Sequence, residues 1–213
     1  MVAIVDYGMG NLSSVANAFA ALGCDCAVVD RPSQLEQAER IVLPGVGSFG
    51  DGMHNLRAGG WIRVLEAQVR EAGKPFLGIC LGMQLLATTG TEHGEHEGLN
   101  WIPGIVERLP CRDDNRDDNL RVPHVGWNDV SIRSGSPMYE ALGAEQTFYF
   151  VHSYVFRPHA LDVVNGVCDY GSSWAASVQA NNIYATQYHP EKSHKAGLAV
   201  LRNFLRVEGA GRA

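Results

Sequence analysis

The chain has 213 residues, of which 46% are hydrophobic and 19% charged, and its formal net charge is −6 at pH 7. This length supports one α/β domain over residues 1–213, and the composition is typical of a globular protein rather than a disordered or fibrous chain. The negative charge disfavours nucleic acid and anionic lipid as partners. The longest apolar runs, such as 76–83, are shorter than the roughly 20 residues needed to cross a bilayer, so we expect no membrane span.

The N-terminal segment and the cysteines indicate the cellular compartment. Residues 2–5 form an apolar run without the basic residues or the cleavage site of a secretory signal. The five cysteines are odd in number and widely spread, in a chain too large to need disulfides. We therefore expect free thiols and a cytoplasmic protein.

The first half of the chain alternates short β-branched runs with helical periods, which predicts β–α–β units. We expect strands over residues 2–5, 27–29, 41–43 and 76–79. We expect helices over 12–22, 33–38, 61–69 and 81–87, with a loop after Pro44 and Gly45. These strands are continuous apolar runs, as parallel strands covered by helices on both faces must be.

The second half is richer in short strands separated by turns. They are expected over 104–109, 122–130, 147–156, 163–168, 173–179 and 183–188, before a closing helix over 193–207. The predicted fold is therefore α/β: a mostly parallel central sheet flanked by helices, with additional antiparallel strands. The acidic stretch 112–119 lacks the glycine and glutamate of an EF-hand loop, so we interpret it as a solvated loop.

The segment Gly78-Ile79-Cys80-Leu81-Gly82 lies between a predicted strand and a predicted helix. This G-x-C-x-G pattern is a nucleophile elbow in which a thiol replaces the usual hydroxyl. The helix N-terminus would favour a thiolate, and the Leu81 N–H can face an oxyanion. The alternative is a cysteine buried as a small hydrophobe, which is our interpretation of the other cysteines: Cys24, Cys26, Cys111 and Cys168.

His189-Pro190-Glu191 could supply the base and the acid that a thiol nucleophile needs. In an extended segment, side chains at positions i and i+2 point the same way, so Glu191 could fix the orientation of the His189 ring. A polar turn is the alternative interpretation of this tripeptide.

Three further segments have possible functional meanings. Residues 45–50 fit G-x-G-x-x-G, but the acidic residue of a dinucleotide site would fall inside a helical period, so an oxyanion hole is favoured. The segment 93–96 contains two histidines without further ligands nearby, so we expect no metal. Residues 123–128, Pro-His-Val-Gly-Trp-Asn, are typical either of an edge strand or of a protein interface.

The segments 78–84 and 189–193 resemble those of the class I (triad) glutamine amidotransferases, and the resemblance covers nearly the whole chain. The segments 6–12, 44–50 and 123–128 resemble in particular the glutaminase subunits of imidazole glycerol phosphate synthases. That family has a flavodoxin-like α/β fold and uses no cofactor in glutamine hydrolysis.

The resemblance implies that Cys80 attacks the glutamine carboxamide, that His189 protonates the departing ammonia and that Glu191 orients His189. A glutamyl thioester forms, and water activated by His189 then releases glutamate. It implies an oxyanion hole formed by backbone N–H groups at Gly45, Val46, Gly47 and Leu81. It also implies that the amino-acid end of the substrate is held by Gln84, Glu92 and the main chain at Ser153 and Tyr154.

The resemblance further implies a heterodimer with a (β/α)₈ cyclase subunit, which uses the ammonia to make imidazole glycerol phosphate and AICAR for histidine biosynthesis. The positions expected near that interface are Asn11, Trp127, Asn128, Tyr149 and Lys192. The chain departs from the family pattern in a longer acidic loop at 111–119. Three alternatives remain: the amidotransferase subunit of another synthase, such as the anthranilate type; a thiol hydrolase or redox flavodoxin-like protein; and a scaffold without activity.

Overall fold

The computed structural model describes residues 1–110, 121–133 and 135–209. The acidic stretch at 112–119, Cys111 and residues 210–213 lie outside these described residues. Within them, no helix is both long enough and apolar enough to pass through a bilayer.

Five strands form a parallel unit: β1 (Val2–Val5), β2 (Cys26–Val29), β3 (Arg40–Gly45), β4 (Phe76–Cys80) and β13 (Ile183–Thr186). All residues of β1, β4 and β13 are buried. This matches their continuous apolar sequence, because helices cover both faces of the sheet.

Four antiparallel strands extend the same sheet: β8 (His124–Ile132), β9 (Glu145–His152), β11 (Val164–Tyr170) and β12 (Ser172–Ala180). Among the described residues, the sheet has nine strands in the order β2-β1-β3-β4-β13-β12-β11-β8-β9. The predicted fold class, a mostly parallel centre with antiparallel additions, is therefore confirmed.

A second sheet of four strands contains β5 (Thr89–Gly90), β6 (His96–Glu97), β7 (Gly104–Arg108) and β10 (Tyr154–Pro158), in the order β10-β7-β5-β6. The single strand expected over 147–156 is wrong, because the chain leaves the large sheet after His152 and joins the small one at Tyr154. The carbonyl of Ser153, at the break, accepts a hydrogen bond from the Leu109 N–H.

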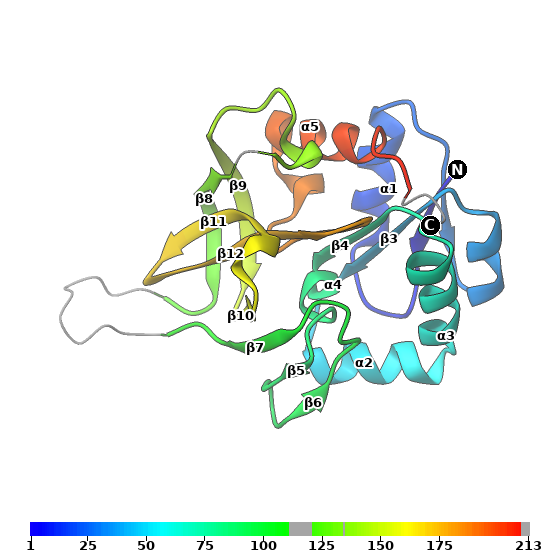
Figure 1. Cartoon of the computed structure of the whole chain (residues 1–213), viewed down its shortest axis with the longest axis horizontal. Helices are drawn as coiled ribbons and strands as arrows, with labels where there is room; N and C mark the ends of the chain where they lie inside the picture. Colours follow the sequence, from blue (N-terminus) through cyan, green and yellow to red (C-terminus); the bar gives the residue numbers. More distant parts are fainter. Residues whose placement is uncertain (111–120, 134, 210–213) are drawn as a thin grey trace.

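Helices cover the two faces of the large sheet. Figure 1 shows α1 (Leu12–Ala21) and α5 (His194–Phe204) on one side, with α2 (Phe49–Ala58) and α3 (Trp61–Leu65) on the other. A π-helical segment, η2 (Glu66–Glu71), continues α3, and the short α4 (Leu81–Gln84) follows β4. Four 3₁₀ turns complete the described structure: η1 (Pro32–Gln37), η3 (Pro137–Tyr139), η4 (Leu161–Val163) and η5 (Pro190–Lys192).

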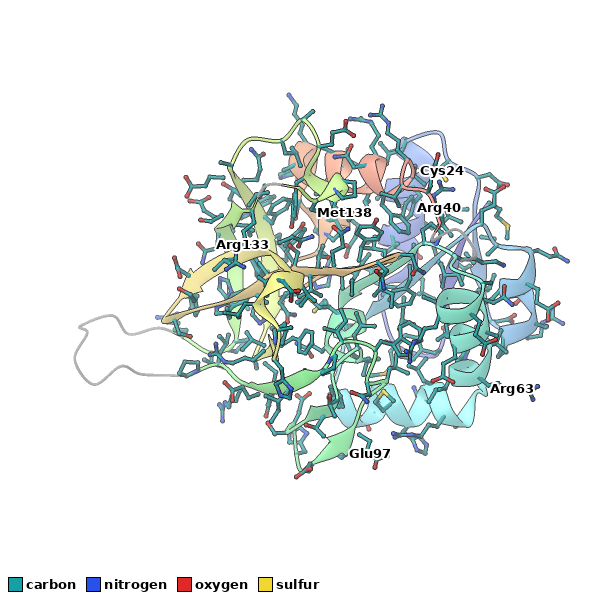
Figure 2. The ribbon with its side chains drawn as sticks, viewed as in Figure 1. Cys24, Arg40, Arg63, Glu97, Arg133 and Met138 are labelled. Carbon is teal, nitrogen blue, oxygen red and sulfur yellow. The ribbon has the colours of Figure 1, made fainter. Side chains whose placement is uncertain are left out.

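Each face of the sheet has its own hydrophobic core. Phe19 of α1 packs in the same core as Leu201 and Phe204 of α5. Arg40, at the start of β3, fastens the end of α5 to the sheet by donating to the carbonyl oxygens of Phe204 and Val207 (Figure 2).

Helix α2 replaces the loop that we expected after Gly45. Ser48 caps it by accepting a hydrogen bond from the Asp51 N–H, and the buried Phe49 anchors it in the core. Gly50 and Gly52 lower the helix propensity of the segment, which hid the helix in the sequence. The absence of a side chain at Gly52 lets Leu81 pack closely, since a Cβ there would lie 3.2 Å from Leu81 Cδ2.

Candidate active site

A cavity of about 250 Å³ lies at the carboxyl edge of the parallel strands. Ligands of α/β sheets commonly bind at this edge. Eight of the predicted functional residues line the cavity: Val46, Gly47, Cys80, Leu81, Gln84, Glu92, Ser153 and Tyr154.

Cys80 forms a strained turn between β4 and α4. Its backbone has φ 54° and ψ −106°, a conformation with positive φ that is rare for a residue with a side chain. The flanking glycines are required, because a Cβ on Gly78 would lie 2.6 Å from the Gly82 carbonyl oxygen and a Cβ on Gly82 would overlap the carbonyl of Leu43. The turn places Cys80 on the cavity wall.

Helix α4 is shorter than the expected 81–87 and ends at Gln84. A helix of four residues has little macrodipole, so the sequence argument that a helix N-terminus favours the thiolate carries little weight. The groups around the sulfur must supply that stabilisation instead.

The imidazole of His189 and the carboxylate of Glu191 form a buried pair. Nδ1 of His189 lies 2.8 Å from Oε1 of Glu191, and the two side chains are 3% and 2% exposed. The expected extended segment is wrong, since Glu191 lies in the 3₁₀ turn η5. The turn nevertheless brings the two side chains together, and the Ser193 hydroxyl fixes it by donating to the His189 carbonyl at 2.6 Å.

The electrostatics of His189 favour its protonated form. Burial alone would lower its pKa, but the adjacent Cys80 and the Glu191 carboxylate outweigh that effect and raise the pKa to about 10. No hydrogen bond of ordinary geometry reaches Nε2 from the described residues. The raised pKa favours an imidazolium at this position, and an imidazolium is a proton donor suited to a leaving amine.

Polar groups on the cavity wall are fixed in position. Gln84 Nε2 donates to the Tyr154 carbonyl at 2.9 Å. Glu92 Oε2 accepts from the Phe49 N–H at 2.8 Å, in the first turn of α2. These bonds leave the Glu92 carboxylate and the Gln84 amide oxygen on the wall, and both are hydrogen-bond acceptors suited to an ammonium group.

The segment Gly45, Val46 and Gly47 runs beside the elbow. Gly45 pairs with Cys80 in the sheet, and a Cβ on it would overlap the Tyr7 hydroxyl. Val46 and Gly47 line the cavity, whereas Gly45 does not. Gly47 has φ 120°, which a residue with a side chain rarely adopts.

Three of the five positions expected at a partner interface lie together: Trp127, Tyr149 and Lys192. Trp127, on β8, is 47% exposed and stacks on His194 with ring centroids 4.8 Å apart. Its ring also contacts Tyr149, over which the ammonium of Lys192 lies 5.9 Å from the centroid. Asn128 follows Trp127 on β8, so its side chain points to the opposite face of the sheet, where its Nδ2 lies 3.4 Å from Nε2 of the buried His124. Asn11 caps α1 by accepting from the Ser14 N–H.

Two groups in contact with the site were not predicted from the sequence, Gln187 and His152. Gln187 is fully buried, and its Nε2 lies 3.6 Å from Cys80 Sγ. His152 lines the cavity, and its Nε2 lies 3.1 Å from Nδ1 of the buried His124. The available signal was a polar Gln187 inside an apolar run, which usually indicates a hydrogen-bonded interior group.

The buried histidine pair should make the protein sensitive to acid. Burial lowers the pKa of His124 to about 4 and, together with smaller effects of neighbouring groups, that of His152 to about 3. In the unfolded chain both histidines are protonated below about pH 6.5, whereas in the folded protein they stay neutral until the pH falls to their lowered pKa values. Their contribution to stability is thus complete above pH 6.5 and is lost as pH falls towards 4 and then 3, each histidine adding a slope of about 1.4 kcal/mol per pH unit.

Urea unfolding between about pH 5 and 7.5 measures this slope. The variant His124→Phe retains an aromatic ring beside Tyr170 and Phe150, and we expect a smaller slope for it. His54→Gln, at an exposed position, is the matched control and should leave the slope unchanged. An unchanged slope in His124→Phe would contradict the prediction.

Comparison with known proteins places this geometry in a family. The chain matches the glutamine amidotransferase class-I family over residues 3–207. It is 47% identical to the imidazole glycerol phosphate synthase subunit HisH of Syntrophotalea carbinolica over 204 residues, which are 96% of this chain and 98% of that protein. It is 48% identical to the protein of the same name from Methanothermobacter thermautotrophicus over 208 residues, which are 97% and 98% of the two chains.

The fold comparison agrees with the sequence comparison. The structure of PurLQS from Thermotoga maritima superimposes with a TM-score of 0.72 at 22% identity, covering 96% of each chain. That likeness supports the fold alone, while the sequence matches extend over nearly the whole chain. The chain therefore belongs to the class I glutamine amidotransferases.

Proposed function

We propose that this chain is the glutaminase subunit of an imidazole glycerol phosphate synthase, and that it hydrolyses glutamine through Cys80, His189 and Glu191. The observation that carries the proposal is a buried His189–Glu191 pair whose imidazole is electrostatically coupled to Cys80, a cysteine at a strained elbow on the wall of a cavity. The two HisH relatives, which are 47% and 48% identical over nearly their full lengths, support the assignment to this synthase.

In the first half of the reaction, the Cys80 thiolate attacks the carboxamide carbon of glutamine. The carbonyl oxygen becomes an oxyanion, held by backbone N–H groups of Leu81 and the 45–47 segment. The His189 imidazolium gives its proton to the departing nitrogen, the C–N bond breaks, and ammonia leaves a glutamyl thioester on the sulfur.

In the second half, the now neutral His189 takes a proton from water as the water oxygen attacks the thioester carbonyl. The C–S bond breaks, glutamate leaves, and the thiolate and imidazolium are restored. Glu191 holds the ring through Nδ1, so Nε2 faces the reacting atoms in both halves.

The partner in this proposal is a cyclase subunit with a (β/α)₈ barrel, bound as a heterodimer to the face around Trp127. Trp127 and Val125 are 47% and 56% exposed, and large exposed apolar side chains on one strand suit a protein interface. The ammonia would pass to this cyclase, which makes imidazole glycerol phosphate in histidine biosynthesis.

The proposal is tested by measuring glutamate release from glutamine, first by this chain alone and then with a cyclase subunit and its nucleotide ligand. We expect low activity alone and a large rise in the complex, because partner binding must align an N–H of the 45–47 segment with the oxyanion. Failure of the complex to release glutamate would overturn the proposed activity. Full turnover by the isolated chain would contradict the activation.

A further inference from the structure

Gln187 is a buried amide in direct contact with the reacting sulfur. It follows β13, is fully buried, and its Nε2 lies 3.6 Å from Cys80 Sγ. Its own backbone N–H donates to the Ala176 carbonyl at 2.8 Å, which fixes the base of the side chain against β12. A polar side chain with these constraints is held in one position by the fold.

The hydrogen bonds of Gln84 determine which end of the Gln187 amide faces the sulfur. Gln84 Nε2 donates to the Tyr154 carbonyl at 2.9 Å and to Oε1 of Gln187 at 3.1 Å. Since Oε1 of Gln187 is occupied as an acceptor, its NH₂ group is the end directed at Cys80. The contact with the sulfur is therefore made by a hydrogen-bond donor.

His152 and His124 extend this hydrogen-bond network, and their partners determine which ring nitrogens carry protons. His152 Nδ1 lies 3.0 Å from the Tyr154 carbonyl, which can only accept, so Nδ1 carries the proton. Nε2 of His152 then accepts from His124 Nδ1 at 3.1 Å. Nε2 of His124 in turn accepts from Asn128 Nδ2 at 3.4 Å. Both rings are neutral in this arrangement, and the Tyr154 carbonyl that positions Gln84 is itself held.

We propose that Gln187 is a further catalytic residue of the glutaminase, whose side-chain amide donates a hydrogen bond to Cys80 Sγ and stabilises the thiolate. The proposal rests on the proposed function of Cys80 as the nucleophile. A donor to the charged form of a group favours that form, and it does so more strongly in a buried site. The same bond assists the second half of the reaction, in which the sulfur leaves the thioester as a thiolate.

The experiment uses two variants at position 187 and one control. Gln187→Met keeps a similar volume and removes the donor. Gln187→Glu keeps an acceptor for Gln84 and places a carboxylate oxygen against the sulfur. Gln179→Met is the matched control, since it removes a glutamine of β12 that accepts from the Ser136 hydroxyl.

The readout is the rate at which iodoacetamide alkylates Cys80, followed by mass spectrometry as a function of pH. This reaction joins the thiolate sulfur to the reagent carbon and releases iodide, so it reports the thiolate without requiring glutamine. The titratable groups facing the sulfur, His189 and the Tyr7 hydroxyl, are unchanged in all variants.

We expect the alkylation profile to move to higher pH by about one unit in Gln187→Met and further in Gln187→Glu, and to stay in place in Gln179→Met. In the complex with the cyclase subunit, we expect kcat for glutamine hydrolysis to fall about tenfold to a hundredfold in Gln187→Met. A normal profile in both position-187 variants would overturn the proposal.

Thermal unfolding distinguishes a variant that has lost its fold from one that has lost only the hydrogen bond to Cys80. If one position-187 variant does not fold, the alkylation profile of the other tests the proposal. A wild-type complex that does not hydrolyse glutamine overturns the proposed function, whereas a wild type that does, with unchanged Gln187 variants, overturns only the role of Gln187.

Discussion

Replacing Cys80 by alanine should abolish glutamine-dependent synthesis by the complex with the cyclase subunit, while synthesis from added ammonium continues. The substitution removes the atom that attacks the carboxamide, and loss of a nucleophile from such a unit typically costs a factor of about 10⁴ or more in kcat. Alanine fits the buried elbow without a clash because it only removes the sulfur. The cyclase therefore keeps its binding partner and loses only its internal source of ammonia.

The measurement is product formation by the reconstituted complex with glutamine or with ammonium chloride. Cys24→Ala is the matched control, since Cys24 is a free thiol at the end of α1, away from the cavity lining, and should leave both activities intact. Glutamine-dependent synthesis that survives in Cys80→Ala would show that the nucleophile is misassigned. Loss of both activities would indicate that the elbow is needed for assembly of the complex.

The parallel half of the fold was predictable because its strands are buried on both faces. A continuous apolar run such as 76–79 is preceded by a helical period and followed by a glycine-flanked cysteine. This combination predicts a buried parallel strand. The prediction failed at α2, where Gly50 and Gly52 obscure the helical pattern. Gly52 packs closely against Leu81, because a Cβ there would lie 3.2 Å from Leu81 Cδ2. Local propensity cannot report such a contact between segments that are distant in sequence.

The second failure is the strand expected over 147–156. Both parts are apolar and β-branched or aromatic, so the sequence does not reveal that the chain changes sheets at Ser153. The break depends on tertiary hydrogen bonds: Ser153 binds the Leu109 N–H through its carbonyl, and the His152 ring contacts the Tyr154 carbonyl. This break places Ser153 and Tyr154 on the cavity wall.

The candidate site was predictable where chemistry is carried by short motifs, and hidden where it depends on contacts across the sheet. Cys80 and His189 are marked by their neighbours in sequence. Gln187 and the pair His124 and His152 become visible only when β8, β9 and β13 lie together, because their partners are distant in the chain. A buried polar residue in an apolar run is a signal that such a partner exists, but it does not identify the partner.

Replacing Glu191 by glutamine should lower kcat for glutamine hydrolysis by a factor of about 10² to 10⁴ without unfolding the protein. The amide has nearly the same shape as the carboxylate but has no negative charge, so it holds the His189 Nδ1–H more weakly. The carboxylate is also one of the groups that raise the pKa of His189 to about 10. In the variant, His189 therefore loses its imidazolium proton at a lower pH.

The contribution of the Glu191 charge to the pKa of His189 fixes the direction in which the pH profile of Glu191→Gln should move. In the wild type, the proton on His189 is present below its pKa and is lost as pH rises through about 10, so the alkaline limb of the kcat/KM profile should lie at high pH. Without the Glu191 charge the pKa of His189 falls, and the alkaline limb moves to lower pH. Glu145→Gln, at an exposed position on β9, is the matched control and should have a wild-type profile. An alkaline limb that stays in place in Glu191→Gln would show that this carboxylate positions the ring without setting its charge.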